Sequence, residues 1–310
     1  MGRRYAVLGT GAIGGLYGAR LAAAGHAVHF LARSDLDHLR TDGLTVESVY
    51  GDVRLDTPSV WDDPTEMPEV DVVLVAIKTT ANDQLPRLLG PFDRPGTTIV
   101  MLQNGLGVET LAADIAPSAE VLGGLCFTCS NRVAPGHIRH LDYGSVTLAA
   151  HHRDGGAAGI TSALEAVASD LESAGVEVVR APDLGVARWR KLVWNMPFNG
   201  LSVLLDATTD ELIADPATHD LAAQLMDEVC AAAEACGSPL GGSTRDDMLE
   251  LTRTMRSYAT SMKLDAEAGR RLELDAIYAA PLDAARRAGA PAPRLETLHA
   301  QLRFLDSRRR

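Results

Sequence analysis

The stretch Gly9-Thr10-Gly11-Ala12-Ile13-Gly14 follows a short apolar run at 5–8 and opens a helix-like stretch over 12–24. Three glycines at this spacing, between a buried strand and a helix, are typical of the Rossmann-type dinucleotide fold. The first glycine makes a tight turn, the second lets the backbone approach a pyrophosphate, and the third allows close helix–strand packing. The amino end of the helix adds N–H groups and a partial positive charge. The stretch therefore predicts a nucleotide-binding loop at the start of the chain.

Strand-like and helix-like patterns alternate through the first part of the chain. Residues 27–31 form the next strand-like run, and residues 70–77 and 98–102 form continuous apolar runs. Continuous apolar strands are typical of parallel sheets that are covered on both faces, and the alternation predicts a doubly wound parallel sheet. An alternating stretch over 44–55, interrupted by Gly51-Asp52, predicts a hairpin.

The pattern changes near residue 180. Residues 177–179 form the last strand-like run, and Ala181-Pro182-Asp183 is typical of a linker. Almost all of the sequence beyond the linker is helix-like. We therefore expect an α/β fold in which an N-terminal Rossmann-type doubly wound parallel sheet, residues 1–180, precedes an all-helical C-terminal domain, residues 181–310.

Two long helical patterns stand out in the second part. Residues 217–236 carry apolar side chains at fourfold spacing, and Gly237 with Pro239 just beyond marks the end of that helix. Residues 257–287 form a second long helical stretch, in which Pro281 is expected to cause a kink or a division.

The charge balance limits the partners of the chain. Its 41 acidic residues outnumber the 29 basic ones and give a net charge of -12 over 310 residues. The average field therefore repels polyanions, which argues against non-specific binding to nucleic acid or to an anionic membrane surface. No apolar run approaches membrane-spanning length, and the first residues lack the apolar core of a signal peptide. We expect a cytoplasmic protein without nucleic-acid or membrane partners.

A possible metal motif occurs at Cys126, Cys129, His137 and His140. Only seven residues separate the two pairs, whereas finger-like sites usually have about twelve or more. Cys126 also lies in an apolar run, 121–127, that predicts a buried strand, and cysteine is often simply a small buried hydrophobe. Four cysteines do not make a disulfide framework in a chain of this length. We expect no metal and no redox site here.

The end of the second strand-like run indicates which nucleotide the site prefers. Folds that bind NAD place Asp or Glu there, about 20 residues beyond the glycines, to accept hydrogen bonds from the ribose hydroxyls. This chain has Arg33 in that place, and a guanidinium can pair with the 2′-phosphate of NADPH. Asp35 is the one nearby carboxylate that would oppose a phosphate. The sequence predicts NADPH rather than NADH.

Two polar residues lie just past the carboxyl ends of predicted strands. Lys78 follows the run at 70–77, and Asn104 follows the run at 98–102. Ligands bind at that edge of an open α/β sheet, so both residues are candidates for the cofactor site. The alternatives are a solvated strand end for Lys78 and a simple turn at Asn104-Gly105.

Residues 188–199, which read RWRKLVWNMPFN, combine large apolar side chains with a row of polar ones. Lys191, Asn195 and Asn199 drift only about 40° per step and so share one face of a helix. An ammonium and two carboxamides in line are costly to bury without a ligand. The alternative is an amphipathic helix whose polar face is turned to water.

Six segments follow one another in a specific order along the chain. They are the glycine loop at 9–14, Lys78, Gln103-Asn104-Gly105, Trp189-Arg190-Lys191-Leu192 with Asn195 and Asn199, Thr260-Ser261-Met262, and Arg271-Leu272-Glu273-Leu274-Asp275. Together they resemble the 2-dehydropantoate 2-reductase (ketopantoate reductase) family nearly end to end. The resemblance implies an NADPH-dependent oxidoreductase that reduces 2-dehydropantoate to pantoate in pantothenate and coenzyme A biosynthesis.

The resemblance also implies roles for individual residues. Lys191 matches the general acid of the family, and Glu273 matches the carboxylate that supports the lysine and the substrate hydroxyl. The expected cofactor contacts are Gly9, Thr10, Gly11, Ala12, Ile13, Gly14, Arg33, Lys78 and Asn104, and the expected substrate contacts are Asn104, Asn195, Asn199 and Ser261. The chemistry suits these residues, because hydride delivery to a ketone builds negative charge on oxygen, which an ammonium can stabilise and then protonate.

One position departs from the family pattern. Where pantoate-forming members often carry an asparagine before Gly-Glu-Leu, this chain reads Thr209-Asp210-Glu211-Leu212. Reduction of another branched or bulkier 2-oxo compound therefore stays open, because a fold does not determine its substrate. An NADPH-binding sensor without catalysis is a further alternative, against which Lys191 and Glu273 argue. A homodimer through the helical domain is also expected.

Overall fold

The computed structural model describes residues 2–308 and divides into two compact units. The sheet unit contains the chain up to Gln103 together with Val108–Leu184. The helical unit contains Asn104–Gly107 and the chain from Gly185 onward. A short segment between two strands of the first unit therefore packs with the second.

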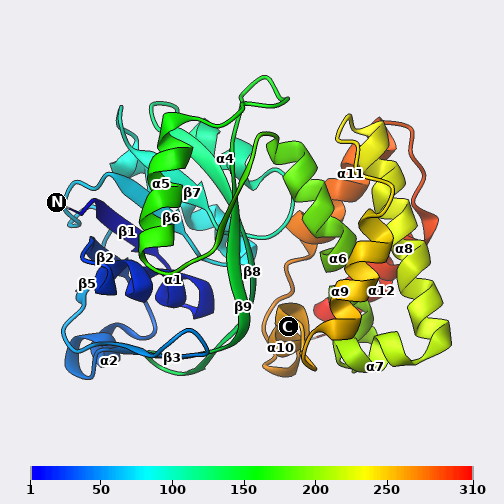
Figure 1. The fold of residues 1–310 in the computed structure, drawn as a ribbon, viewed down its shortest axis with the longest axis horizontal. Helices are drawn as coiled ribbons and strands as arrows, with labels where there is room; N and C mark the ends of the chain where they lie inside the picture. The colour runs from blue at the N-terminus through cyan, green and yellow to red at the C-terminus, as the bar shows by residue number, and fades with distance from the viewer. Residues whose placement is uncertain (1, 309–310) are drawn as a thin grey trace. The chain divides into compact units, whose positions relative to one another are not determined.

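Ten strands form one sheet in the sheet unit (Figure 1). Their order is β4-β3-β9-β8-β7-β6-β1-β2-β5, and β10 pairs with β9. The six strands β5, β2, β1, β6, β7 and β8 are neighbours in this order and all pair in parallel, which is the strand order of the dinucleotide-binding fold. The bounds are β1 (Arg4–Leu8), β2 (Ala27–Leu31), β3 (Leu44–Ser48), β4 (Val53–Leu55), β5 (Ser59–Trp61), β6 (Val72–Val75), β7 (Thr98–Met101), β8 (Glu120–Ala134), β9 (His137–Ala150) and β10 (Val178–Ala181).

The Rossmann-type sheet and its hairpin are confirmed, but the sheet is mixed rather than parallel throughout. The expected hairpin is formed by β3 and β4, which pair antiparallel. A second, longer hairpin is formed by β8 and β9, whose pairing runs from Leu122↔Ala150 to Ala134↔His137 with shifts in register. Its far part, residues 128–143, extends past the parallel strands, and His137–His140 pairs with β3. We call residues 128–143 the arm.

Helices cover both faces of the sheet. On one face, α1 (Ala12–Ala23) and α5 (Ser162–Ser173) share a core with Tyr5, Val7 and Leu74. Alternate residues of the same strands point to the other face and are also buried. The remaining helices of the unit, among which α3 and α4 contact each other, are α2 (Leu36–Thr41), η1 (Thr79–Gln84), α3 (Leu85–Leu89), η2 (Gly90–Phe92) and α4 (Val108–Ile115).

The helical unit is built around α8 (Pro216–Ala235), which contacts α7, α9, α11 and α12 (Figure 1). As expected, all regular elements described here are helical. They are α6 (Leu184–Leu204), α7 (Thr209–Ala214), α9 (Thr244–Thr254), α10 (Ser261–Glu267), η3 (Asp275–Ala279), α11 (Ala280–Arg287) and α12 (Pro293–Ser307).

The long helical stretch predicted over 257–287 is divided between Glu267 and Asp275, and not at Pro281. Helix α10 begins after the N-cap Thr260, whose hydroxyl accepts from the Lys263 N–H. It ends at Glu267, and Gly269 follows the C-cap Ala268 with a φ of +64°. Glycine in that conformation commonly terminates a helix. Pro281 does not end a helix, because α11 continues directly from η3, which is a π-helical turn. A π-helical turn next to a proline is a common place for a helix to bend.

Candidate active site

The glycine loop joins β1 to α1 and is tight at its first and third glycines. Gly9 has a φ of +101°, and a Cβ at Gly14 would lie 2.0 Å from the Gly9 carbonyl oxygen. A Cβ at Gly11, by contrast, would meet nothing within 4 Å. Gly11 is also the N-cap of α1 and provides no side-chain cap. The loop thus leaves open space and helix N–H groups where a pyrophosphate would approach.

Arg33 and Asp35 follow β2 and have opposite environments. Arg33 is exposed, and no residue between 2 and 308 pairs with its guanidinium. Asp35 is 4% exposed; it forms an ion pair with Arg132 and accepts from the Ser34 hydroxyl at 2.8 Å and the Gly136 N–H at 3.3 Å. Burial alone would raise the pKa of Asp35, but these hydrogen bonds outweigh burial and lower it. The carboxylate is therefore ionised and already neutralised.

The edge of the sheet beyond β6 and β7 is held together by a glutamine. Lys78 is exposed just after β6. Gln103, directly after β7, is 4% exposed and donates through Nε2 to the Ile77 carbonyl at 2.9 Å and to Asn82 Oδ1 at 2.7 Å. The motif Gln103-Asn104-Gly105 predicts no role for Gln103. The signal available for this cross-link was a carboxamide directly after an apolar strand-like run, because polar groups at such a place need hydrogen-bond partners when they are buried.

The polar row of α6 lies in the helical unit and is largely buried. Lys191 is half-buried, whereas Asn195 and Asn199 are 5% and 2% exposed. The carboxamides therefore do not face water, and that alternative is wrong for them. Asn199 Oδ1 is buried and accepts no hydrogen bond from the described residues. Such an acceptor costs about 1–3 kcal/mol, which a bound hydrogen-bond donor would offset.

Glu273 and Asn104 are brought to neighbouring segments of the same unit. Glu273 is 4% exposed and precedes η3. The segment Asn104–Gly107 docks on η3, because the Leu106 N–H donates to the Ala276 carbonyl at 2.9 Å. The Tyr278 hydroxyl then donates to the Met196 carbonyl at 2.6 Å and ties η3 to α6. Lys191, Glu273 and Asn104 thus lie on mutually connected elements.

Ser261 is connected to the same helix through its neighbour. The hydroxyls of Thr260 and Ser202 lie 2.7 Å apart, and Ser202 also donates to the Asn199 carbonyl at 3.2 Å. Ser261 itself is half-buried at the start of α10. All six residues expected at the substrate or the proton therefore belong to the helical unit.

Thr209, at the position that departs from the family pattern, is fully buried. Its N–H and its hydroxyl donate to the Tyr258 carbonyl at 3.2 and 3.4 Å. The hydroxyl is therefore already used within the protein, which leaves it less able than a free carboxamide to bind a ligand.

The cysteines and histidines of the possible metal motif lie on β8 and β9 with other partners. The His140 ring is held by the Ser48 hydroxyl at 2.8 Å and the Tyr143 carbonyl at 2.6 Å. Burial raises the pKa of Cys129 to about 12, so its thiol is protonated at neutral pH. Among residues 2–308, no group of three or more His, Cys, Asp or Glu side chains is arranged to hold a metal ion.

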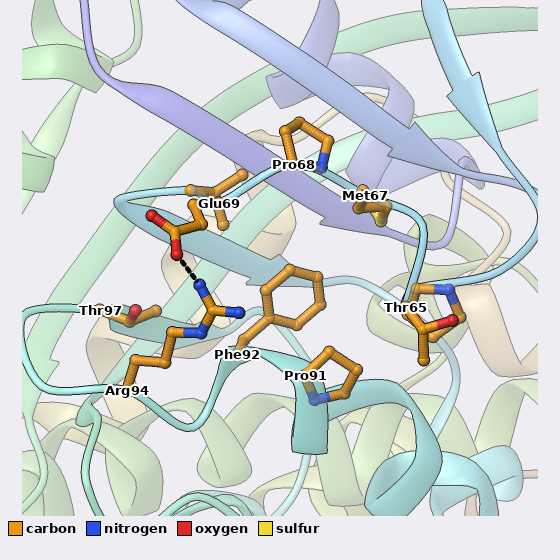
Figure 2. Close-up of a pocket in the computed structure, with 10 residues that line it drawn as sticks. Thr65, Met67, Pro68, Glu69, Pro91, Phe92, Arg94 and Thr97 are labelled. Atoms are coloured by element: carbon orange, nitrogen blue, oxygen red, sulfur yellow. Dashed lines mark hydrogen bonds and ion pairs between the residues drawn. The ribbon is translucent and has the colours of Figure 1, made fainter.

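A small cavity lies at the opposite edge of the sheet from the glycine loop. Figure 2 shows Phe92 and Pro91 facing Met67 and Pro68. The cavity that these residues help to line has a volume of about 40 Å³. The lining segments precede β6 and β7 and thus lie at the amino ends of these strands. Arg94 is ion-paired with Glu69 there. Because open α/β sheets bind ligands at their carboxyl edge, this cavity is not the candidate site.

Known proteins match the chain along almost its whole length. The family model "Ketopantoate reductase PanE/ApbA" matches residues 5–153, and its C-terminal counterpart matches residues 183–306. The chain belongs to the ketopantoate reductase family. A 2-dehydropantoate 2-reductase of Nostoc sp. is 47% identical over 308 residues, covering 99% of this chain and 97% of that protein.

Solved structures agree with this family and with the fold. A 2-dehydropantoate 2-reductase from Geobacter metallireducens has a TM-score of 0.91 and is 39% identical, with 97% of this chain and 99% of that chain covered. One from Methylococcus capsulatus has a TM-score of 0.89 and is 33% identical, with coverages of 99% and 97%. In the described part of this family member, no helix combines the length and apolarity needed to cross a bilayer.

Proposed function

We propose that the chain catalyses the NADPH-dependent reduction of 2-dehydropantoate to pantoate, a step in pantothenate and coenzyme A biosynthesis. The names of its similar proteins supply the reaction. The observation that carries the proposal is the buried polar row of α6, in which Asn199 Oδ1 has no hydrogen-bond donor among the described residues. A polar substrate would satisfy that oxygen.

The residues of the glycine loop fit the cofactor. Gly9, Thr10, Gly11, Ala12, Ile13 and Gly14 would hold the pyrophosphate, and Arg33 would pair with the 2′-phosphate, with Lys78 and Asn104 as further contacts. The open space above Gly11 and the unpaired guanidinium of Arg33 support this assignment. When bound, NADPH supplies the hydride that reduces the ketone.

Lys191 would stabilise the negative charge on the substrate oxygen and protonate it, and Glu273 would support Lys191. Hydride addition to the carbonyl carbon leaves an alkoxide, which the Lys191 ammonium stabilises and then protonates, so that the ketone becomes an alcohol. Glu273 would hold the ammonium and the substrate hydroxyl. Asn104, Asn195, Asn199 and Ser261 would orient the substrate without adding unpaired charge.

The two parts of the chain would bind different molecules. We assign NADPH binding to residues 1–180 and substrate binding with proton transfer to residues 181–310, with Asn104 as the contribution of the first part to the second. The Asn104–Gly107 segment supports this, because it packs with the helical unit.

We place the enzyme in the cytoplasm, as a homodimer formed through the helical unit. The cysteines of the chain are all free, which suits a reducing compartment. Phe304 on α12 is 61% exposed and offers an apolar contact for a second copy. Sedimentation equilibrium of the wild type tests the dimer.

A panel of 2-oxo acids tests the proposal. Loss of NADPH absorbance should be fastest with 2-dehydropantoate, and the Lys191→Ala variant serves as the control for enzyme-dependent turnover. Faster turnover of a bulkier 2-oxo compound would assign the chain to a related reductase. The observation that favours this alternative is Thr209, whose hydroxyl is buried and already bonded within the protein. Tight NADPH binding without turnover of any of these compounds would make it a sensor.

A further inference from the structure

The arm, residues 128–143, contacts both parts of the nucleotide site. On the glycine-loop side, the Ser130 hydroxyl donates to the Ala12 carbonyl at 3.3 Å. A Cβ at Gly15 would lie 2.0 Å from Ile138 Cδ1, so the arm packs directly on the backbone of α1. These contacts place the arm beside the turn that would hold the pyrophosphate.

On the other side, the arm holds the segment that follows Arg33. Arg132 is ion-paired with Asp35, and the Gly136 N–H donates to the same carboxylate at 3.3 Å. A Cβ at Gly136 would lie 2.4 Å from the His38 ring, so the tip of the arm fits closely against α2. Asp35 thus points toward the arm rather than toward solvent.

We propose that Arg132 determines the preference for NADPH by neutralising the Asp35 carboxylate two residues from Arg33. This rests on the proposed function, because it assumes a 2′-phosphate at Arg33. Asp35 and Arg33 carry opposite charges, and without Arg132 they would cancel near the phosphate. With Arg132 the charge of Asp35 is compensated, and the positive charge of Arg33 remains for the phosphate.

Asp35 lies two residues beyond the position at which NAD-binding folds place their carboxylate, and it is bound by residues of the arm. The low pKa of Asp35 keeps the carboxylate ionised at neutral pH, so its charge must be compensated. Arg132 is 41% exposed in its side chain, which leaves part of its guanidinium on the solvent side of the pair. Arg132 acts through Asp35 and is a positioning residue rather than a catalytic one.

Binding of two nucleotides without a nicotinamide tests this role. Isothermal titration of the full chain with 2′,5′-ADP and with 5′-AMP isolates the contribution of the 2′-phosphate. We expect Arg132→Gln to lower the affinity for 2′,5′-ADP about tenfold at low salt, with a smaller loss at high salt. The affinity for 5′-AMP should change less than about twofold, because it has no 2′-phosphate.

Two further variants separate charge from structure. Asp35→Asn in the Arg132→Gln background should restore the ratio of the affinities for 2′,5′-ADP and 5′-AMP. Arg132→Lys should keep this ratio close to that of the wild type. Arg139→Gln is the matched control, because Arg139 lies on the same arm and pairs with the more exposed Glu47 at 2.8 Å. It should leave the ratio unchanged.

An equal loss of affinity for both nucleotides in Arg132→Gln would show that Arg132 only supports the arm, and would overturn the inference. If Arg132→Gln does not fold, Asp35→Asn alone decides, because removing the carboxylate should keep or raise the ratio and a fall would refute the role. A wild type that binds both nucleotides equally would refute the NADPH assignment itself. If the wild type prefers 2′,5′-ADP and Arg132→Gln keeps the same ratio of affinities for the two nucleotides, only the role of Arg132 is refuted.

Discussion

Replacing Gly105 with alanine should disturb the segment that carries Asn104 without touching any charged group. Gly105 has a φ of +101°, and a Cβ there would lie 2.4 Å from the Ala276 carbonyl oxygen and 2.5 Å from Ala276 Cβ. Neither neighbour can rotate away, since one is backbone and the other is fixed to it. Gly107 in the same segment has a φ of +83°, but a Cβ there would meet nothing within 4 Å. It is the matched control.

The geometry gives different magnitudes for the two variants. Both alanines would adopt a left-handed conformation, which costs about 1–2 kcal/mol. Only Gly105→Ala also forces atoms into a packed contact, which costs about 1–3 kcal/mol more. We therefore expect Gly105→Ala to lower the free energy of unfolding by about 2–5 kcal/mol, and Gly107→Ala by about 1–2 kcal/mol.

Relief of the contact requires Asn104–Gly107 to move away from η3. A displacement of about 1 Å at a positioning residue can lower kcat/KM about a hundredfold, so Gly105→Ala should show that loss on 2-dehydropantoate while Gly107→Ala stays near wild type. Urea denaturation and steady-state kinetics measure both effects. Equal destabilisation of the two variants would refute the packed contact at Gly105. A wild-type kcat/KM for Gly105→Ala would refute the assignment of this segment to the active site.

Four other substitutions or measurements follow from the site. Lys191→Ala should lower kcat about a hundredfold or more, while the NADPH dissociation constant barely changes. Lys191→Arg should restore little activity, because a guanidinium does not readily release a proton. Near-normal turnover of Lys191→Ala would rule the lysine out as the acid. Arg33→Asp should flatten or reverse the ratio of kcat/KM for NADPH and NADH, and equal wild-type values for the two cofactors would contradict the role of Arg33. Asn199→Leu should leave the free energy of unfolding unchanged or raise it, since it removes an unpaired buried oxygen. The same variant should lower kcat/KM at least about tenfold, because the substrate loses its acceptor. A fully active variant would show that the substrate does not use this oxygen. Elemental analysis of chelator-treated protein should find no stoichiometric metal at Cys126 and Cys129, and zinc required for turnover would contradict this.

The local pattern of the sequence was sufficient for the core of the sheet unit. The glycine loop lies between β1 and α1, and the apolar runs at 70–77 and 98–102 are β6 and β7, which pair in parallel. The hairpin over 44–55 is β3 and β4. These elements depend on residues close in sequence, whose spacing and apolarity decide strand or helix. Their predicted ends differ from the observed ones by a few residues, because strand ends depend on the neighbouring strands.

Contacts between distant residues could not be derived in this way. The arm pairs Thr45 with His137, and Asn104–Gly107 packs on Ala276, although roughly 90 and 170 residues separate these partners. Periodicity carries no information on such pairings. The prediction for 257–287 failed for a related reason, since the pattern is helical on both sides of Gly269 and does not reveal the positive φ that ends α10.

The polar row of α6 shows why burial decides between two interpretations of one pattern. By periodicity alone, Lys191, Asn195 and Asn199 fit a helix face turned to water. The fold buries the two asparagines and leaves Asn199 Oδ1 without a donor in the described chain, a net cost to stability of about 1–3 kcal/mol. An apolar side chain of similar size would avoid that cost at the same place. Asn199 therefore lowers the free energy of unfolding without a benefit to packing. A hydrogen-bond donor of the substrate would offset that cost while the substrate is bound. Asp35 is a different case, because Arg132 and the Gly136 N–H satisfy its buried carboxylate within the protein. Asn199 Oδ1 has no such partner among the described residues, and stability alone does not account for its burial.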